Sequence, residues 1–295
     1  MLPAYEPLVA PARPRRQLWR TLLGMALILL IYFLWMAGMG LVLWLIDGTE
    51  DFVTRLQHIG EGADPGSLML LFASFLGGWL GVWVTVHLLH RRSLGSLMGR
   101  APVVLRDFTL GLVIFVLVGG GMTLAVLPLL PPLTLRPEIG PWLALLPLAL
   151  LGVLVQTGAE ELVFRGYLQS QLAARFRHPL VYLGVPTVLF GLAHYNPVEL
   201  GENVWIVLAS TGLFGLIAGD MTRRTGSLGL AWGLHFANNV LAILLVNVTG
   251  ALDGLSLLEA PEGAMDAALL RPLLLADMAL MALVWAACRL WLRAR

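Results

Sequence analysis

Five side chains that can do chemistry lie in or beside apolar stretches of this 295-residue chain. They are the adjacent Glu160 and Glu161, then His194, His235 and Asn239. Ionisable groups inside a membrane-spanning segment cost about 3 kcal/mol each and usually mark function. Together these residues supply a general base, a second proton carrier and hydrogen-bond donors. That combination is typical of a site that hydrolyses an acyl bond.

Helical spacing indicates which of these side chains share a face. Glu161 and Arg165 are four residues apart with the acid on the N-terminal side, which favours an ion pair along one helix. Glu160 is then free to face elsewhere. His235 and Asn239 are also four residues apart, so both project from one face and can converge on one small group.

A turn in the chain predicts the depth of two of these residues. His178-Pro179 is a natural helix stop, and Glu160 and His194 are equally far from residue 177 in the sequence. In an antiparallel hairpin that rises about 1.5 Å per residue, equal separation gives equal depth. We therefore expect Glu160 and His194 to line one polar cavity, together with His235 and Asn239.

The elements that must position these residues are membrane helices. Hydrophobic residues make up 58% of the chain, charged residues only 13%, and the mean hydropathy is +0.83. Such a composition lies outside the range of soluble proteins, and a spanning helix needs about 20 apolar residues. The predicted fold class is all-α, a polytopic membrane helix bundle with about eight transmembrane helices. The apolar segments lie near residues 21–46, 67–90, 108–130, 141–168, 180–195, 204–219, 227–248 and 267–290.

Loop charges alternate along the chain and predict its orientation. Arginine-rich segments face the cytoplasm, which places both termini there. The arginines between the apolar segments or at the end of the chain include Arg91, Arg92, Arg100, Arg106, Arg175, Arg177, Arg223, Arg224, Arg289, Arg293 and Arg295. The intervening loops carry Asp47, Glu50, Asp51, Glu61, Asp64, Glu199, Glu202, Asp253, Glu259, Glu262 and Asp266. We expect a multi-pass protein of a cell inner (plasma) membrane, with residues 1–20 as a cytoplasmic N-terminal tail and residues 21–295 as a single membrane domain.

Other features narrow the classes of function. The first apolar stretch is too long for the core of a signal peptide, so we expect a retained first helix. Dispersed arginines and a net charge of +1 argue against a nucleic-acid partner. Cys288 is the single cysteine, which excludes an intramolecular disulfide and a Cys-based metal cluster.

Small residues and two further charges bear on packing. Gly77 with Gly81, and Gly215 with Gly219, are spaced to let helices approach closely in lipid. Asp220 precedes two arginines and is predicted to be a helix-end charge at the membrane interface. In the last segment Arg271 and Asp277 either form a structural pair or separately face solvent and the bundle interior.

Simpler interpretations exist for each polar residue alone. A histidine in a membrane helix can bond to a neighbouring helix, and an acidic pair can be a solvated helix end. A buried Glu/His network also serves non-enzymatic transporters, and immunity or other partner-binding proteins. Transporters often repeat broken helices at matching positions in two halves, a pattern that is not seen here.

Three motifs in order resemble the CPBP family of intramembrane peptidases, which includes CAAX prenyl endopeptidases and Abi-type bacteriocin-processing or immunity proteins. They are Glu160-Glu161 with Arg165, then Phe190 with His194, then His235 with Asn239. The resemblance covers residues 140–250, and the three motifs are specific jointly.

The resemblance implies an intramembrane endopeptidase without a cofactor or a metal. Glu160 and His194 would activate water, His235 and Asn239 would stabilise the oxyanion, and Glu161 and Arg165 would orient the first motif helix. A zinc-dependent variant, with Glu160, His194 and His235 as ligands, is the alternative. The expected partners are membrane lipid and a peptide or membrane-protein substrate. Short loops suggest a bacterial protein, so a prenylated substrate is not favoured.

Overall fold

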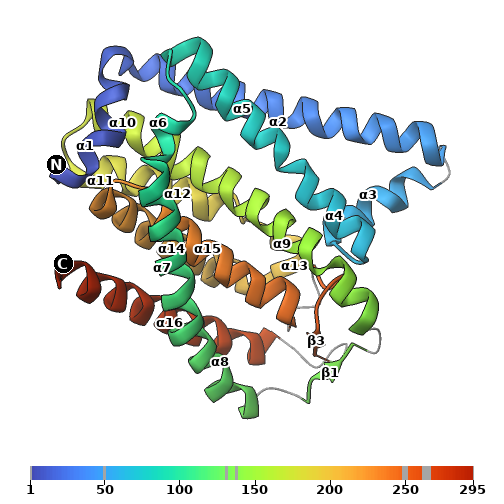
Figure 1. Ribbon diagram of the computed structural model, residues 1–295. Helices are drawn as coiled ribbons and strands as arrows, with labels where there is room; N and C mark the ends of the chain where they lie inside the picture. Colours follow the sequence, from blue (N-terminus) through green and yellow to red (C-terminus); the bar gives the residue numbers. More distant parts are fainter. Residues whose placement is uncertain are drawn as a thin grey trace.

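Both chain termini lie at the same end of a helix bundle (Figure 1). The computed structural model describes residues 2–48, 51–129, 132–136, 139–247, 252–260 and 267–294. We refer to the end of the bundle with both termini as the terminal end and to the other as the distal end. Among the acidic loop residues expected from the sequence, Glu50, Glu262 and Asp266 lie outside the described residues.

Each apolar segment expected from the sequence is helical over most of its described residues. Among the described residues, six helical stretches are long and apolar enough to span a membrane, and two shorter apolar helices accompany them. The six are Leu18–Ile46, Pro65–His90, Ala101–Val126, Ile139–Arg175, Gly201–Thr225 and Arg271–Arg293. The shorter two are Pro179–Leu192, which leads to His194, and Gly229–Leu245, which carries His235 and Asn239. The chain is a multi-pass, all-α membrane helix bundle, as predicted.

Several spans are composed of more than one helix. The longer helices are α2 (Leu18–Asp47), α7 (Ala101–Phe115), α9 (Ile139–Glu161), α14 (Val204–Thr225), α15 (Gly229–Asn239) and α16 (Ala267–Arg293). The shorter ones are α1 (Glu6–Val9), α3 (Phe52–Glu61), α4 (Pro65–Ser74), α5 (Leu76–Thr85), α6 (Gly95–Met98), α8 (Gly121–Val126), α10 (Ser170–Arg175), α11 (Pro179–Tyr182), α12 (Gly184–Leu192) and α13 (Pro197–Leu200). Two π-helical segments, Leu162–Gln169 and Val240–Leu245, begin directly after Glu161 and Asn239. Such irregular turns are frequent at functional sites.

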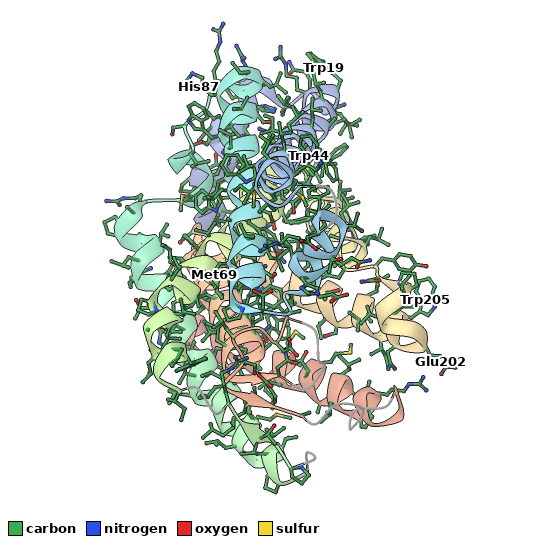
Figure 2. The ribbon with its side chains drawn as sticks, turned by 90° about the vertical axis from the view of Figure 1, so that its right-hand side faces the viewer. Trp19, Trp44, Met69, His87, Glu202 and Trp205 are labelled. Atoms are coloured by element: carbon green, nitrogen blue, oxygen red, sulfur yellow. The ribbon has the colours of Figure 1, made fainter. Side chains whose placement is uncertain are left out.

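Helix α2 shows most of its surface to the surroundings of the bundle. Near its two ends, Trp19 is 56% exposed and Trp44 is 42% exposed (Figure 2). Their separation along the helix is about 37 Å at 1.5 Å per residue. Because tryptophan prefers the membrane–water interface and a bilayer with its headgroups is about 40 Å thick, the two rings fit opposite interfaces.

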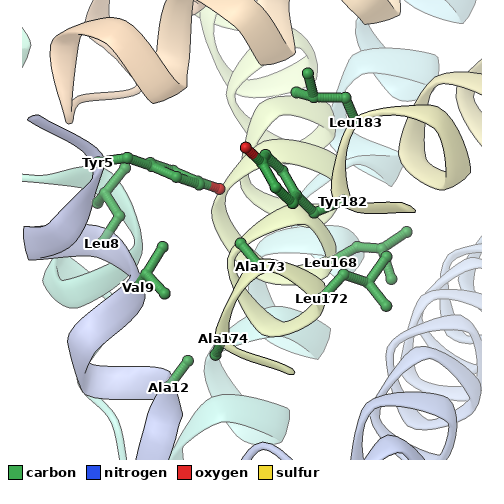
Figure 3. Packing of buried hydrophobic residues seen from close by; sticks show 10 residues of the cluster. All are labelled: Tyr5, Leu8, Val9, Ala12, Leu168, Leu172, Ala173, Ala174, Tyr182 and Leu183. Atoms are coloured by element: carbon green, nitrogen blue, oxygen red, sulfur yellow. The ribbon is translucent and has the colours of Figure 1, made fainter. Parts of the chain in front are cut away.

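The N-terminal segment packs against the terminal end of the bundle. Tyr5, Leu8, Val9 and Ala12 are at most 1% exposed and meet the apolar side chains of α10 and α11, together with Leu168 and Leu183 (Figure 3). Arg92 donates from Nη2 to the Leu8 carbonyl at 3.0 Å. The sequence predicts a tail, whereas apolar burial makes this segment part of the folded bundle.

A small sheet lies at the distal end. It consists of β1 (Thr134–Leu135), β3 (Leu258–Glu259) and β2 (Val246–Asn247), with β1 antiparallel and β2 parallel to β3. Arg136 donates to the carbonyls of Asp253 and Ser256 and to Glu259. These loop contacts are long-range, which is why hydropathy does not predict them.

The charges of the last span do not pair with each other. Arg271 donates to Asn203 and Glu202, both at 3.4 Å, whereas Asp277 accepts from Ser210 at 3.2 Å. The interpretation in which Arg271 and Asp277 act separately is therefore confirmed, and the structural pair is not formed.

Glycines set the closest helix contacts in the bundle. A Cβ on Gly81 of α5 would lie 2.9 Å from the Ile28 carbonyl of α2, and one on Gly219 would lie 2.9 Å from Gln169 Oε1. The expected close approaches are therefore confirmed. A further close contact was not expected: Cβ atoms on Gly229 and Gly233 of α15 would overlap the carbonyl oxygens of Val104 and Phe108 on α7.

The α7–α15 contact generates a prediction of stability. We expect Gly233→Ala to destabilise the protein by about 1–3 kcal/mol, because the added methyl group meets backbone that cannot rotate away. Thermal unfolding of the purified protein measures this. Gly212→Ala is the matched control, since the nearest atom to its Cβ would be 4.0 Å away. An equal melting temperature for the two variants would contradict the packing argument.

The shared position of both termini generates a prediction of topology. A reporter fused after Arg295, and one fused before the N-terminal segment, should both be active on the cytoplasmic side, because arginines flank the spans at that end. An alkaline phosphatase fusion, which is active only outside the cytoplasm, should be inactive at either terminus. Phosphatase activity at one terminus alone would contradict the even number of crossings.

Candidate active site

A cavity of about 690 Å³ lies inside the bundle, between walls from α2, α4, α9, α12, α14 and α15. Most of its lining is apolar. The polar groups that line it include Gln156, Glu160, His194, Thr211 and Asn239. Glu160 and His194 thus share one cavity, as the hairpin argument predicts, and Asn239 joins them. His235 is not among the lining residues, and it reaches the site from within the protein.

The buried pair expected between Glu161 and Arg165 is present. Arg165 Nη1 donates to Glu161 Oε1 at 2.9 Å, and the two side chains are 1% and 0% exposed. His235 Nδ1 lies 2.9 Å from the same oxygen. Because a carboxylate oxygen that already accepts from Arg165 can only accept again, Nδ1 of His235 must carry a hydrogen. Glu161 therefore fixes the orientation of His235, with its Nε2 on the opposite side of the ring.

Phe190 explains why an aromatic residue precedes His194 by four positions. The Arg165 guanidinium carbon lies 4.3 Å from the centre of the Phe190 ring, within the range of a cation–π contact. The same ring packs against His194 with centroids 4.9 Å apart and against His235 with centroids 6.0 Å apart. One phenyl ring therefore screens the buried cation and spaces the two histidines.

The end of α12 determines which nitrogen of His194 is free. His194 Nδ1 lies 2.9 Å from the Phe190 carbonyl oxygen, in the last turn of the helix, where carbonyls lack helical partners. A carbonyl oxygen only accepts, so Nδ1 carries a hydrogen. In the neutral imidazole Nε2 is then the acceptor. His194 lines the cavity, and its Nε2, which can take a proton, is not used by the bond to Phe190.

Gln156 is a site residue that the motifs did not indicate. Its Nε2 donates to Glu160 Oε1 at 2.8 Å, and its Oε1 accepts from Asn239 Nδ2 at 2.9 Å. One amide therefore joins the glutamate of the first motif to the asparagine of the third. A sequence signal exists, because Gln156 precedes Glu160 by four residues and must share its helix face.

The second oxygen of Glu160 is in a different position. Within the described part of the chain, Glu160 Oε2 is buried and has no hydrogen-bond partner. His235 Nε2 lies 3.5 Å away, which is a charge contact rather than a well-formed hydrogen bond. Glu160 lines the cavity, and this oxygen is the one that is not engaged by a hydrogen bond from the protein.

Leu252 lines the cavity from the distal loops and was also not expected. Its φ is +59°, an uncommon conformation for a bulky residue. Backbone hydrogen bonds hold the segment there: Leu252 N donates to the Glu61 carbonyl and Gly254 N to the Gly62 carbonyl. The α3–α4 loop therefore forces this side chain into the cavity wall, at a cost in backbone strain.

Metal-ligand geometry bears on the zinc alternative. Among the described residues, no three His, Cys, Asp or Glu side chains form a group that could hold a metal ion. The contacts of Glu160 and His235 are instead with each other and with neighbouring protein groups.

The family comparison falls on the same region. Residues 141–241 match the family model described as Type II CAAX prenyl endopeptidase Rce1-like. The chain is 33% identical over 111 residues to the uncharacterized protein YyaK of Bacillus subtilis (strain 168), a match that covers 37% of each protein. No solved structure matches the chain. The matched region contains all three motifs, so the resemblance is confirmed there: residues 141–241 are similar to the Type II CAAX prenyl endopeptidase Rce1-like family.

Proposed function

We propose that this protein is an intramembrane endopeptidase that hydrolyses a peptide bond of a membrane-associated substrate with water activated by Glu160 and His194. The observation that carries the proposal is the shared cavity: a carboxylate with one free oxygen and a histidine with its tautomer fixed both face it. The match of residues 141–241 to a peptidase family supports the reaction class.

The proposed reaction begins with a water molecule between Glu160 and His194. Glu160 takes a proton from the water while the water oxygen attacks the carbonyl carbon of the substrate. The carbonyl π bond opens and its electrons form an oxyanion. The oxyanion electrons then re-form the carbonyl π bond as the carbon–nitrogen bond breaks, and the nitrogen takes the proton held by Glu160 and leaves as the amine. His194 carries a second proton through Nε2, because Nδ1 is committed to the Phe190 carbonyl.

The oxyanion would be stabilised by donors from α15. Asn239 lies at the cavity wall, and His235 Nε2 would be the second donor in the imidazolium form, which carries a hydrogen on both ring nitrogens. Its contact with Glu160 is long enough to be exchanged for a contact with substrate. Both donors are oriented by other side chains, Asn239 by Gln156 and His235 by Glu161. Such preorganisation is what makes oxyanion stabilisation effective.

The cavity walls indicate the chemistry of the substrate. Apolar side chains of α2 and α4 face the polar cluster, so the scissile bond must lie next to an apolar group. A leader peptide or a membrane-protein segment supplies this through its side chains, and a prenylated C-terminus supplies it through its lipid. We favour the first class, and a farnesylated CAAX peptide is the probe that tests the second.

The role of Glu160 generates a prediction of activity. In Glu160→Gln, cleavage should be lost while the folded protein still accumulates in the membrane, because the amide keeps the shape but cannot take a proton. Mass spectrometry of membrane peptides from cells with the wild type and with the variant should show the substrate accumulating intact. Thr211→Val is the matched control: Thr211 lines the same cavity but donates to Val207 of its own helix.

Two results would contradict the proposal. Cleavage at the wild-type rate by Glu160→Gln would leave the Glu/His network as a transport or partner-binding site. Loss of activity in the presence of a chelator, restored by added zinc, would instead support the metal-dependent variant.

The Gln156 bridge generates a prediction of coupling. Asn239→Ala should lower kcat by about 10²–10³, the usual effect of removing one oxyanion donor. Gln156→Leu should also lower kcat, since it releases both Glu160 and Asn239, with KM little changed. Kinetics with the peptide substrate found by mass spectrometry should show that kcat falls less in the double variant Gln156→Leu/Asn239→Ala than the product of the two single effects predicts. Independent, multiplying effects would mean that Gln156 does not act through Asn239.

A further inference from the structure

A second cavity opens at the terminal end, apart from the site of Glu160. It has a volume of about 320 Å³, lies between α14, α16 and the start of α12, and shares no lining residue with the catalytic cavity. Its inner part is apolar and includes Leu213, Leu216 and Ile217 of α14 and Ala282 of α16. Its outer part is polar. The proposed peptidase mechanism uses none of these residues.

The polar part carries an excess of positive charge around one carboxylate. Asp220 accepts from Arg223 at 2.7 Å, from Arg224 at 2.9 Å and from Arg289 at 3.2 Å. Trp285 Nε1 also donates to Asp220 Oδ2, at 3.0 Å. Three guanidinium groups share one carboxylate, so the formal charge of the cluster is 3 − 1 = +2.

One of these arginines has donor capacity left. Arg289 Nε is buried and has no hydrogen-bond partner within the described residues. Its ion pair is with Asp220, whose Oδ2 it shares with Arg224 and Trp285, and its guanidinium carbon lies 5.0 Å from the centre of the Trp285 ring. A buried donor without a partner is costly, and an acceptor from outside the protein would relieve that cost.

The polar and apolar parts of the cavity follow one another as the headgroup and the acyl chain do in one leaflet of a bilayer. From Arg223 to Leu213 the helix rises about 15 Å, which is about half the thickness of the hydrocarbon core. The arginines and Trp285 belong at the headgroup level, where amphipathic and cationic side chains are favoured. The apolar walls then lie at the depth of an acyl chain.

We propose that this cavity binds one anionic phospholipid, with its phosphate at Arg289 and Arg223 and one acyl chain between α14 and α16. Basic pockets between membrane helices are suited to anionic headgroups, because the uncompensated charge stays with the phosphate. A zwitterionic lipid brings its own cation and satisfies the +2 cluster less well. A free phosphate would meet the arginines but leave the apolar part unfilled.

Native mass spectrometry of the purified full-length protein tests the proposal without reference to peptidase activity. Phosphatidylglycerol should bind more tightly than phosphatidylcholine, and Arg289→Gln should weaken phosphatidylglycerol about fivefold, the equivalent of about 1 kcal/mol per arginine. Arg289→Lys keeps the charge and should restore most of the binding. Arg224→Gln is the matched control, because Arg224 contacts the same Asp220 but does not line the cavity.

Two further arms identify the source of the phosphate. Ala282→Trp fills the apolar part and should abolish phospholipid binding without touching the arginines. Glycerol phosphate should compete poorly with phosphatidylglycerol for the wild-type site. Equal binding of the two lipids, or equal effects of Arg289→Gln and Arg224→Gln, would overturn the proposal. Full competition by glycerol phosphate, with no effect of Ala282→Trp, would replace the lipid by a small phosphate ligand and overturn it too.

Discussion

The buried ion pair between Glu161 and Arg165 is the interaction on which the site depends. Both side chains are almost fully removed from solvent, so neither charge is tolerable without the other. The pair joins two successive turns of the first motif helix. Its carboxylate orients His235 on α15, and its guanidinium packs on the ring of Phe190 on α12. Three helices are thereby placed around one charge, and Glu160, the neighbour of Glu161, is left to face the cavity.

Close backbone approach supplies the precision that this charge network needs. Gly229 and Gly233 bring α15 against the carbonyls of α7, and His235 follows the second glycine by two residues. The π-helical segments that begin after Glu161 and Asn239 change the helical register at these two residues. Apolar packing in lipid is weakly directional, so small residues and irregular turns determine where the polar groups point.

The two ends of the bundle are built differently. At the terminal end, Arg92 donates to the Ser170 hydroxyl and the Leu8 carbonyl, and the N-terminal segment packs its apolar side chains against the bundle. At the distal end, short loops pair as strands and hold Leu252 against the cavity. The excess of positive charge at one end is consistent with contact with anionic lipid there and with a cytoplasmic orientation.

Hydropathy, spacing and motif order by themselves determined the helical membrane bundle, the Glu161–Arg165 pair and the common cavity of Glu160 and His194. These are local or periodic properties, since a helix places residues four apart on one face whatever surrounds it. Only the tertiary structure decided that Gln156 joins Glu160 to Asn239, that His235 approaches from within the protein, and that Leu252 closes part of the wall. Gln156 and Glu160 share a helix face, but the contacts of Gln156 with Asn239 and of His235 with Glu160, and the place of Leu252, bring together residues between which the chain reverses direction. They depend on helix packing and loop pairing that no periodic pattern in the sequence encodes.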